Sequence, residues 1–374
     1  MVVQNGFEAF QDRKCPDWFA KPQMGIFIHW GLYSVPAWAP HGQPLDVMLR
    51  ENYDNGCAVQ PYAEWYANAI AIPGSPSAIY HKAHYGDAPY TDFRTAFDDA
   101  AQAFDADNWV DIFVEAGAQY VVFVTKHHDG FCLWPTEVEN PHRPGWHSKR
   151  DFVGELATAT RRRGLKFGVY YSGGLDWTFR HEPIHNLGEM LACIPTSGDY
   201  RSYAAAQVRE LIARYQPSVL WNDIGWPNRE DLPSLFADYY AAVPDGVIND
   251  RWLGESAMFE GLRSPDMLAQ FNAHLKSKIS QGESIMSTPL HADYRTIEYG
   301  LGELPENKKW EACRGVGLSF GHNQNEDESN YLSHEQLCAL RDTVLAENGN
   351  FLINIGPKAD GSIPEVQRLA LVGR

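Results

Sequence analysis

Several common features are missing from this chain of 374 residues, and each absence narrows its class. No stretch approaches the roughly 20 consecutive apolar residues that a membrane-spanning helix needs. Basic residues are scarce, because 31 Lys and Arg stand against 48 Asp and Glu and leave a net charge of -17. Nucleic-acid binding relies on Lys and Arg to neutralise phosphates, so this charge argues against polyanionic partners. We therefore expect a protein that binds neither membranes nor nucleic acids and acts on something neutral or cationic.

Paired cysteine motifs are missing as well. The six cysteines are scattered, with no C-x-x-C pair and no spacing typical of a zinc knuckle or a small disulfide scaffold. The opening MVVQNGFEAFQDRK lacks the apolar core of a secretory signal, and no N-x-S/T sequon occurs. These features predict free thiols and a cytoplasmic protein. A signal peptide that has already been removed would give the same pattern. The sequence also allows a homo-oligomer.

Short apolar runs alternate with helical patterns along the chain. The runs of strand length cover residues 24–30, 120–125, 165–171, 217–223, 247–251 and 351–355. Between them apolar residues recur at helical spacing, as in a helix that Asp107 would cap and Gly117 would end. The stretch between residue 30 and Asp107 reads as a long loop punctuated by glycine and proline. Apolar strands that alternate with helices predict a parallel sheet covered on both faces, so the fold class is α/β.

Polar residues gather where these apolar runs end. They are His29, His127, His128, Tyr170, Asp223 and Arg251. Residues at such positions form the mouth of a (β/α)8 barrel, whereas an open doubly wound sheet usually has a glycine-rich phosphate loop after its first strand, which is absent here. We therefore predict a single (β/α)8-like TIM barrel domain over 1–374. An insertion at about 253–290, with a short helix over 265–279, would lie over the barrel mouth.

Asp223 stands out within the run 217–227, PSVLWNDIGWP, because it ends an apolar strand between Trp221 and Trp226. Desolvating a carboxylate is costly, so an acid among aromatic residues at the end of a strand is typical of an active site. The two indoles would then offer flat apolar faces to sugar rings. An isolated W-x-D is more often a helix N-cap beside core tryptophans, so Asp223 alone does not decide the function.

His127, His128 and Asp129 are residue types that bind zinc or iron. Successive residues of a strand point to opposite faces, and the H-x-H spacing that places two imidazoles on one face is absent. We therefore favour hydrogen bonding of these histidines to substrate hydroxyls and predict no metal and no cofactor. A buried histidine pair with a purely structural role is the other interpretation.

Hydrolysis of a glycosidic bond needs a second carboxylate beside Asp223, because one acid protonates the leaving oxygen while the other attacks or activates water. The candidates are Glu298, Glu64 and the insertion acids Glu255, Glu260 and Glu283. Spacing alone does not rank them.

Long motifs in one order carry a resemblance to a known family. They are MGIFIHWGLYSVPAW, AEWYANAI, HKAHYGD, ADNWVDIFVEAGAQYVVFVTKHHDGFCLWP, LKFGVYYSGGLDW, LWNDIGWP, INDRW, DYRTIEY, KWEACRGVGLSFGHNQNE and NGNFLINIGP. From about Trp18 to its last residues, the chain resembles the α-L-fucosidases of glycoside hydrolase family 29. The resemblance implies a (β/α)8-like barrel and a retaining exo-α-L-fucosidase that forms a covalent fucosyl-enzyme intermediate. Its partner would be a fucosylated oligosaccharide or glycoside.

The resemblance also implies roles for single residues. The family's nucleophile falls on Asp223, and its acid/base is similar in context to Glu298 in the T-x-E-Y stretch. The residues expected to bind the hydroxyls and ring of fucose are His29, Glu64, His127, His128, Tyr170, Trp221 and Arg251. Phe320 would face the methyl group. A cation such as Arg251 would keep the nucleophile ionised, while burial or the charge of Asp223 would hold the proton on Glu298.

Two departures from the family pattern affect these assignments. The stretch 252–297 is much longer than in compact members, so the assignment of Glu298 depends on DYRTIEY, and the insertion acids remain its alternatives. Residues 364–374 resemble the start of the last barrel helix, and the C-terminal β-sandwich common in the family is missing from the sequence, either because the protein lacks it or because the sequence stops short of it. Two other functions remain open, namely a catalytically silent carbohydrate-binding barrel and a metal-dependent hydrolase that uses His127, His128 and Asp129.

Overall fold

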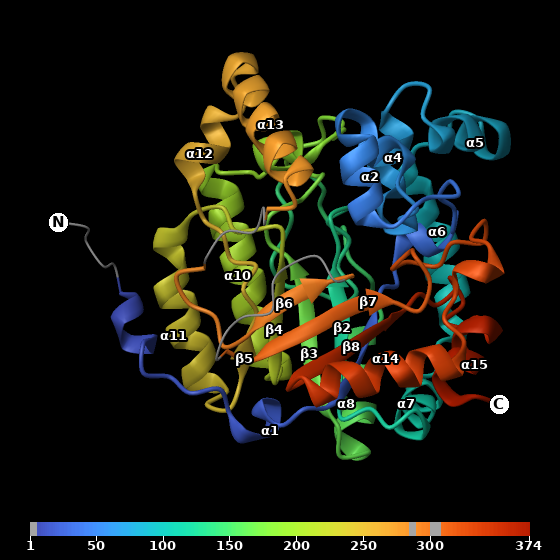
Figure 1. Cartoon of the computed structure of the whole chain (residues 1–374), viewed down its shortest axis with the longest axis vertical. Helices are drawn as coiled ribbons and strands as arrows, with labels where there is room; N and C mark the ends of the chain where they lie inside the picture. The colour runs from blue at the N-terminus through green and yellow to red at the C-terminus, as the bar shows by residue number, and fades with distance from the viewer. Residues whose placement is uncertain (1–5, 284–288, 300–307) are drawn as a thin grey trace.

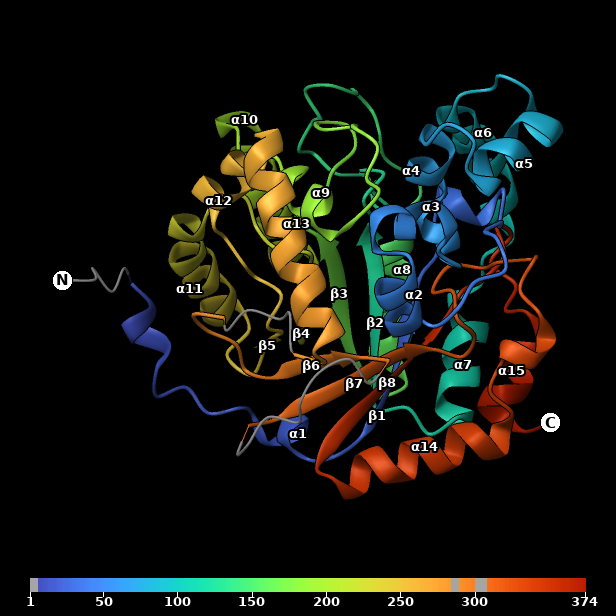
Figure 2. The ribbon, with the colours of Figure 1, turned by 45° about the horizontal axis from the view of Figure 1, so that its top comes forward.

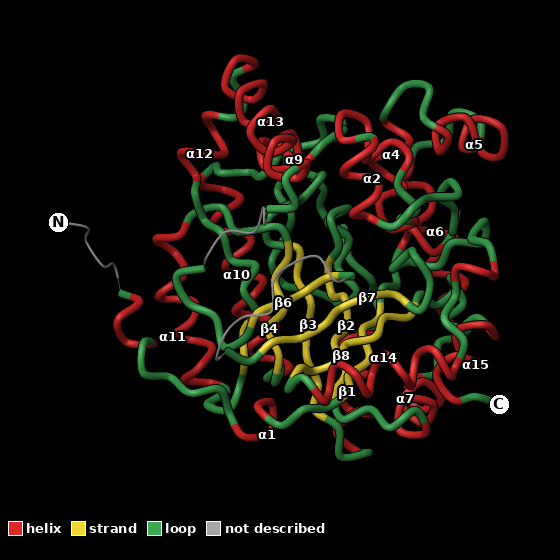
Figure 3. The backbone as a smooth tube through the Cα atoms, viewed as in Figure 1, coloured by secondary structure: helices red, strands yellow, loops and turns green. Residues whose placement is uncertain are grey.

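The computed structural model describes residues 6–283, 289–299 and 308–374 and is built around one parallel sheet (Figures 1 and 3). Its strands are β1 (Met24–Ile28), β2 (Tyr120–Lys126), β3 (Lys166–Ser172), β4 (Val219–Asp223), β5 (Val247–Ile248), β6 (Arg295–Glu298), β7 (Trp310–Gly315) and β8 (Gly349–Ile355). They lie in the order β5-β4-β3-β2-β1-β8-β7-β6, and all of these neighbours pair in parallel. Sequential strands lie side by side, and the first strand pairs with the last, as in a (β/α)8 barrel. The sheet is therefore curled, and the predicted α/β barrel class is confirmed.

The two edge strands of this sheet, β5 and β6, are not joined by a ladder in the described part of the chain. Aspartates connect them instead. The N–H of Ile248 donates to Oδ2 of Asp293 at 2.8 Å, and the N–H of Asp293 donates to the carbonyl of Ile248 at 3.1 Å. The N–H of Thr296 donates to Oδ1 of Asp250, also at 3.1 Å. We call this contact, made by residues 248, 250, 293 and 296, the aspartate seam.

Long helices surround the sheet, and local capping signals explain where they begin (Figures 1 and 3). They are α7 (Ala106–Glu115), α8 (Phe152–Arg162), α10 (Gly198–Tyr215), α11 (Leu232–Ala242), α14 (His334–Ala346) and α15 (Glu365–Val372). Asp151 caps α8, and Ser333 forms a capping box with Gln336 at α14. The predicted cap of α7 is wrong by two positions. Asp105 accepts the N–H groups of Asp107 and Asn108, so Asp107 lies in the first turn.

The segment before α7 contains more helix than the sequence indicated. The expected long loop holds α2 (Leu45–Glu51), α3 (Gly56–Val59), α4 (Tyr66–Ala71), α5 (Pro76–Tyr85) and α6 (Phe93–Ala100), while α1 (Asp17–Ala20) precedes β1. The longest of these, α5, has 10 residues. Hydrophobic periodicity needs a window of about 11–18 residues, so helices this short escape it.

Residues from the predicted insertion form α12 (Ser256–Gly261) and α13 (Pro265–Ser280) beside α9 (Leu187–Ala192) (Figure 2). The predicted helix over 265–279 is confirmed. The Tyr53 hydroxyl donates to Oδ1 of Asn272 at 2.8 Å, and Lys276 pairs with Asp54 at 2.6 Å, so α13 is fixed to the segment after α2. Part of the insertion, 284–288, lies outside the described residues, and the single-domain boundary stays a prediction.

Buried apolar side chains form two clusters on opposite faces of the strands. The outer cluster includes Ile26, Ile28 and Leu220 and packs against the surrounding helices. The inner cluster includes Phe27 and Trp221 and fills the curl of the sheet. This alternation is the period of two that a strand imposes on its side chains. No helix in the described ranges is long and apolar enough to cross a bilayer.

Candidate active site

Strand alternation turns the side chain of Asp223 into the mouth of the barrel. Val219 and Trp221 belong to the inner cluster, whereas Leu220 between them belongs to the outer cluster. Asp223 ends β4 two residues after Trp221 and therefore shares its inward face. It lines a cavity of about 980 Å³ at the carboxyl ends of the strands.

All ten residues to which the family resemblance assigns a role line this one cavity. These residues are His29, Glu64, His127, His128, Tyr170, Trp221, Asp223, Arg251, Glu298 and Phe320. Most of them come from the ends of different strands, as catalytic residues do in (β/α)8 barrels, whereas Glu64 lies in a 3₁₀ turn between β1 and β2. The fold thus brings the whole predicted set together, while the role of each residue stays a prediction.

Arg251 lies between two carboxyl groups. Its Nη2 is 2.9 Å from Oε2 of Glu298, and its Nη1 is 3.5 Å from Oδ1 of Asp223. Its guanidinium carbon is 5.3 Å from the centroid of the Trp221 ring, a distance at which a cation interacts with an indole face. One cation therefore holds the ends of β4 and β6 together.

Asp223 accepts hydrogen bonds from two further donors. The Tyr170 hydroxyl donates to Oδ2 at 2.9 Å, and the N–H of Ile224 donates to Oδ1 at 2.9 Å. Ile224 has a φ of 62°, in the left-handed region that β-branched residues rarely adopt. Backbone strain of this kind clusters at functional sites, where the surrounding structure over-determines the conformation.

The two carboxyls differ in the groups that oppose the effect of burial on their pKa. Burial raises the pKa of Asp223, and this rise is opposed by Arg251, by the Tyr170 hydroxyl and by the Ile224 N–H. Burial also raises the pKa of Glu298; Arg251 opposes that rise, but the negative charge of Asp223 adds to it. Asp223 therefore has more donors that stabilise its ionised form than Glu298 has.

The other candidate acids have different surroundings. They are Glu64, Glu255, Glu260 and Glu283. Glu64 accepts the N–H of Gly321 at 2.8 Å, and burial raises its pKa to about 7. Glu255 pairs with Arg229 at 3.2 Å, and Glu260 and Glu283 are exposed. All of these acids are described, and Glu298 is the one that shares Arg251 with Asp223.

Both adjacent histidines reach the cavity because they lie beyond the irregular end of β2. The ladder of β2 with β3 shifts register between Val124 and Lys126. Val124 belongs to the inner cluster. The side chain of Lys126 lies on the outer side, with Nζ 4.5 Å from the ring centroid of Tyr171, a residue of the outer cluster. His127 and His128 follow the end of the strand, where alternation no longer applies, and both line the cavity. Burial lowers the pKa of each well below its ordinary value, so both rings are neutral.

Hydrogen-bond networks assign the tautomers of two site histidines. Nδ2 of Asn354 donates to the carbonyl of Phe320, so its Oδ1 accepts from Nδ1 of His29 at 2.6 Å. Ser172 donates to a backbone carbonyl, so its oxygen accepts from Nδ1 of His128 at 2.7 Å. Both rings therefore keep Nε2 as an acceptor, which suits the hydroxyl groups of a sugar.

Two supporting residues escaped the sequence analysis. Glu311 in β7 accepts Nε1–H of Trp221 at 3.2 Å and the Tyr120 hydroxyl at 2.6 Å, and Asn354 in β8 orients His29. Both are fully buried polar residues within strands. A polar residue inside an otherwise apolar run, as in FLINI, is the signal that could have found Asn354.

Trp226 does not contribute to the site, so the prediction that it would stack on sugar is wrong. Its side chain is 0% exposed, belongs to the outer cluster and packs on Trp252 with ring centroids 5.3 Å apart. The helix-cap interpretation of Asp223 is wrong as well, because Asn228 caps the 3₁₀ turn that follows β4.

The side chains of His127, His128 and Asp129 do not converge on one point as metal ligands would. Asp129 accepts the Tyr90 hydroxyl at 2.8 Å and the N–H of Phe131 at 3.0 Å. Across the described ranges, no group of three or more His, Cys, Asp or Glu side chains is arranged to hold a metal ion.

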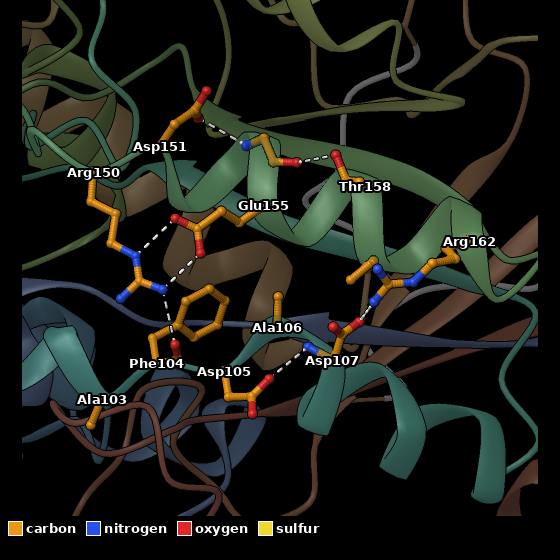
Figure 4. A pocket seen from close by; sticks show the side chains of 12 residues that line it. Ala103, Phe104, Asp105, Ala106, Asp107, Arg150, Asp151, Glu155, Thr158 and Arg162 are labelled. Carbon is orange, nitrogen blue, oxygen red and sulfur yellow. Dashed lines mark hydrogen bonds and ion pairs between the residues drawn. The ribbon is translucent and has the colours of Figure 1, made fainter.

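A second cavity, of about 790 Å³, lies between α7 and α8 and shares no residue with the first (Figure 4). Each of its charged side chains has a partner within the protein, as Asp151 has in Arg214 and Asp105 in the N–H of Asp107. Arg150 binds Glu155 at 2.7 Å, and Arg162 binds Asp107. Because these groups satisfy each other, the cavity lacks the convergent unpaired groups that mark a ligand site.

Comparisons with known proteins point to one family. The model of the family described as alpha-L-fucosidase matches residues 3–374. Among curated relatives, the alpha-L-fucosidase of Dictyostelium discoideum is 29% identical over 98% of this chain and 71% of its own length. The tissue alpha-L-fucosidase of Homo sapiens is 28% identical over 98% of this chain and 68% of its own length.

Solved structures agree with these relatives. The crystal structure of Thermotoga maritima alpha-fucosidase is 42% identical, covers 98% of this chain and 74% of its own, and superposes with a TM-score of 0.79. An alpha-L-fucosidase from Lactobacillus casei is 22% identical with a TM-score of 0.63, covers 95% of each chain, and supports the fold.

Proposed function

The chain belongs to the α-L-fucosidase family of glycoside hydrolases, and on that premise we propose that it removes terminal α-L-fucosyl residues by a retaining mechanism. The observation that carries the proposal is the position of Arg251 between Asp223 and Glu298. A retaining glycosidase needs two carboxyls close together and in different protonation states. A shared guanidinium, with extra donors on Asp223 alone, supports that arrangement.

In the proposed first step, a carboxylate oxygen of Asp223 attacks C1 of the fucosyl unit. The bond from C1 to the glycosidic oxygen breaks, and Glu298 gives its proton to the departing oxygen. In the second step, Glu298 takes a proton from water, the water oxygen attacks C1, and Asp223 leaves. Two displacements at C1 retain its configuration.

Substrate binding in this proposal rests on the surrounding side chains. The neutral imidazoles of His29 and His128 would accept hydrogen bonds from sugar hydroxyls. Phe320 and Trp221 would cover the apolar parts of the sugar. One solved relative, the Thermotoga maritima alpha-fucosidase, is in complex with fucose. A fucosylated glycan or glycoside is therefore the proposed substrate of this chain.

Replacement of Asp223 by glycine tests the mechanism. We expect the kcat of Asp223→Gly on an aryl α-L-fucoside to fall by more than about 10⁴-fold, because no group remains to attack C1. Added azide should enter the vacated space and give β-L-fucosyl azide, identified by NMR. Asp245→Gly, the same change at an exposed turn, is the control and should keep full activity.

Near-normal turnover by Asp223→Gly would remove Asp223 as nucleophile. Fucose binding by the unmodified protein without any hydrolysis would instead support the catalytically silent barrel.

A further inference from the structure

The cavity of the carboxyl pair extends well beyond the residues proposed to bind fucose. Besides those residues, its lining includes side chains from α9, α12 and α13 and from α2. A cavity of about 980 Å³ is at the upper end of the range that encloses a drug-sized ligand, and a single sugar ring needs much less. If the fucosyl unit occupies the inner end near His29, this outer wall faces the group attached to the glycosidic oxygen.

The outer wall is rich in flexible apolar side chains. Among its residues are Met48, Met190, Leu191, Met258, Phe271 and Ile279. Three of the seven methionines of the chain thus line this cavity. Methionine has a polarizable, unbranched side chain and recurs at surfaces that accept varied apolar ligands.

Several polar side chains of the same wall are occupied by the protein itself. Glu255 pairs with Arg229 at 3.2 Å, and Nδ1 of His185 contacts Glu189 at 2.8 Å. Asn186 caps α9 by accepting the N–H of Glu189 at 3.1 Å. These groups contrast with Nε2 of the inner histidines, which is left as an acceptor.

The wall is also fixed in place before any ligand binds. The hydrogen bond from Tyr53 to Asn272 holds α13 on one side. On the other side Gly188 of α9 lies so close to α13 that a Cβ there would approach Oδ1 of Asn272 to within 2.1 Å, so the two helices are in direct contact. Because the wall is preformed, ligand binding loses little free energy to the ordering of these side chains and helices.

We propose that α9, α12 and α13 form an aglycone subsite for an apolar group, so that the preferred substrates carry fucose directly on an aromatic or long alkyl aglycone. The proposal rests on the fucosidase function proposed above. A sugar in this position would place much of its surface against methionine and leucine, and each hydroxyl that His274 or Glu283 does not reach would be buried unmatched, which is costly. An alkyl or aryl group would instead bury apolar surface on both sides.

Two alkyl fucosides separate this proposal from the proposed function. Ethyl and octyl α-L-fucoside have leaving alcohols of similar acidity, so a difference in kcat/KM reports how the alkyl chain binds. We expect octyl to exceed ethyl by about 10- to 100-fold, because part of the added chain is buried. We also expect octyl α-L-fucoside to exceed an α1,2-fucosylated lactose.

Paired variants locate the effect in the structure. The double change Met190→Gln and Met258→Gln keeps side-chain length but makes the wall polar, and we expect the octyl-to-ethyl ratio to fall several-fold. Met267→Gln is the matched control, since Met267 lies on α13, is 52% exposed and does not line the cavity. It should leave the ratio unchanged.

The outcomes are distinguishable. Absence of turnover on ethyl, octyl and aryl α-L-fucosides would overturn the proposed function itself. Turnover of ethyl α-L-fucoside with no gain for octyl would overturn the apolar subsite and leave the proposed function standing. A preference for the fucosylated lactose over the octyl fucoside, or a ratio unchanged by the double variant, would overturn the subsite as well.

Discussion

Asp223 and Glu298 both end parallel strands, yet their strands are held differently. Asp223 ends β4, which pairs with β3 on one side and with β5 on the other. Glu298 ends β6, an edge strand that pairs with β7 and meets β5 through the aspartate seam. Asp223 also accepts from the Tyr170 hydroxyl and the Ile224 N–H, contacts beyond the Arg251 that it shares with Glu298.

This difference matches the work proposed for each acid. A nucleophile must attack C1 along one line, so a central strand and several donors suit it. An acid/base must release a proton to the leaving oxygen and later take one from water, so fewer fixed donors leave its protonation state free to change. Asp223, on the more rigid strand, thus has the role that depends on the direction of attack. Glu298, on the edge strand, has the role that depends on its protonation state.

After the loss expected for Asp223→Gly, the largest effect in this comparison should come from Glu298→Ala. We expect kcat/KM on an alkyl α-L-fucoside to fall by about 10²- to 10⁴-fold, because the leaving oxygen loses its proton donor. Hydrolysis of an aryl fucoside with an acidic phenol should be much less affected, since that phenolate leaves without help. Steady-state kinetics on both substrates measure the contrast.

Glu255→Ala and Glu283→Ala are the matched controls, because both acids line the same cavity. Either control would displace Glu298 as the acid if it showed the strong dependence on the leaving group and Glu298→Ala did not.

A smaller effect should follow from Tyr170→Phe, which removes one donor from Asp223. The donated hydrogen bond lowers the pKa of Asp223, so its loss raises that pKa further. Because the nucleophile must be ionised, the acidic limb of the pH profile of kcat/KM should move to higher pH. Tyr171→Phe is the control, since the Tyr171 hydroxyl donates to Gln207 on the outer side. An acidic limb that stays in place in Tyr170→Phe would show that this donor does not set the ionisation of Asp223.

The smallest effect on catalysis should come from Asp293→Asn, in the aspartate seam. Asp293 also accepts the Tyr240 hydroxyl at 2.8 Å and pairs with Arg13 at 3.1 Å. Loss of its charge weakens several charge-assisted hydrogen bonds, and we expect the free energy of unfolding to fall by about 1–3 kcal/mol. Urea denaturation measures this, with Asp238→Asn in an exposed pair as control. Equal stability of the two variants would mean that the seam adds nothing to the barrel.

The sequence predicted strands well where packing alone determines them. β1 to β4 and β8 are almost entirely buried, so they read as continuous apolar runs. β6 and β7 appeared only as motifs of the family resemblance, because their sequences RTIE and WEACRG carry charged residues. A strand that brings Glu298 or Glu311 into the barrel cannot look apolar.

Site residues were predictable to the extent that a strand end marks them. His29 and Asp223 could be placed by alternation within their own strands. Trp226 could not, because it follows the strand, where the chain turns through the left-handed Ile224 and Gly225 and alternation no longer applies. Glu311 and Asn354 contact site residues from other strands, and such contacts exist only once the barrel has formed.

The aspartate seam has an evolutionary consequence. Residues added inside a strand shift its register and disturb every pair that follows, whereas residues added to the connection between two strands leave the ladders intact. β5 and β6 share no ladder in the described chain, and the chain between them contains α12 and α13. Since the entropy of closing a loop rises slowly with its length, this junction can lengthen at little cost to stability. Selection can therefore remodel the wall that receives the aglycone while the carboxyl pair keeps its geometry.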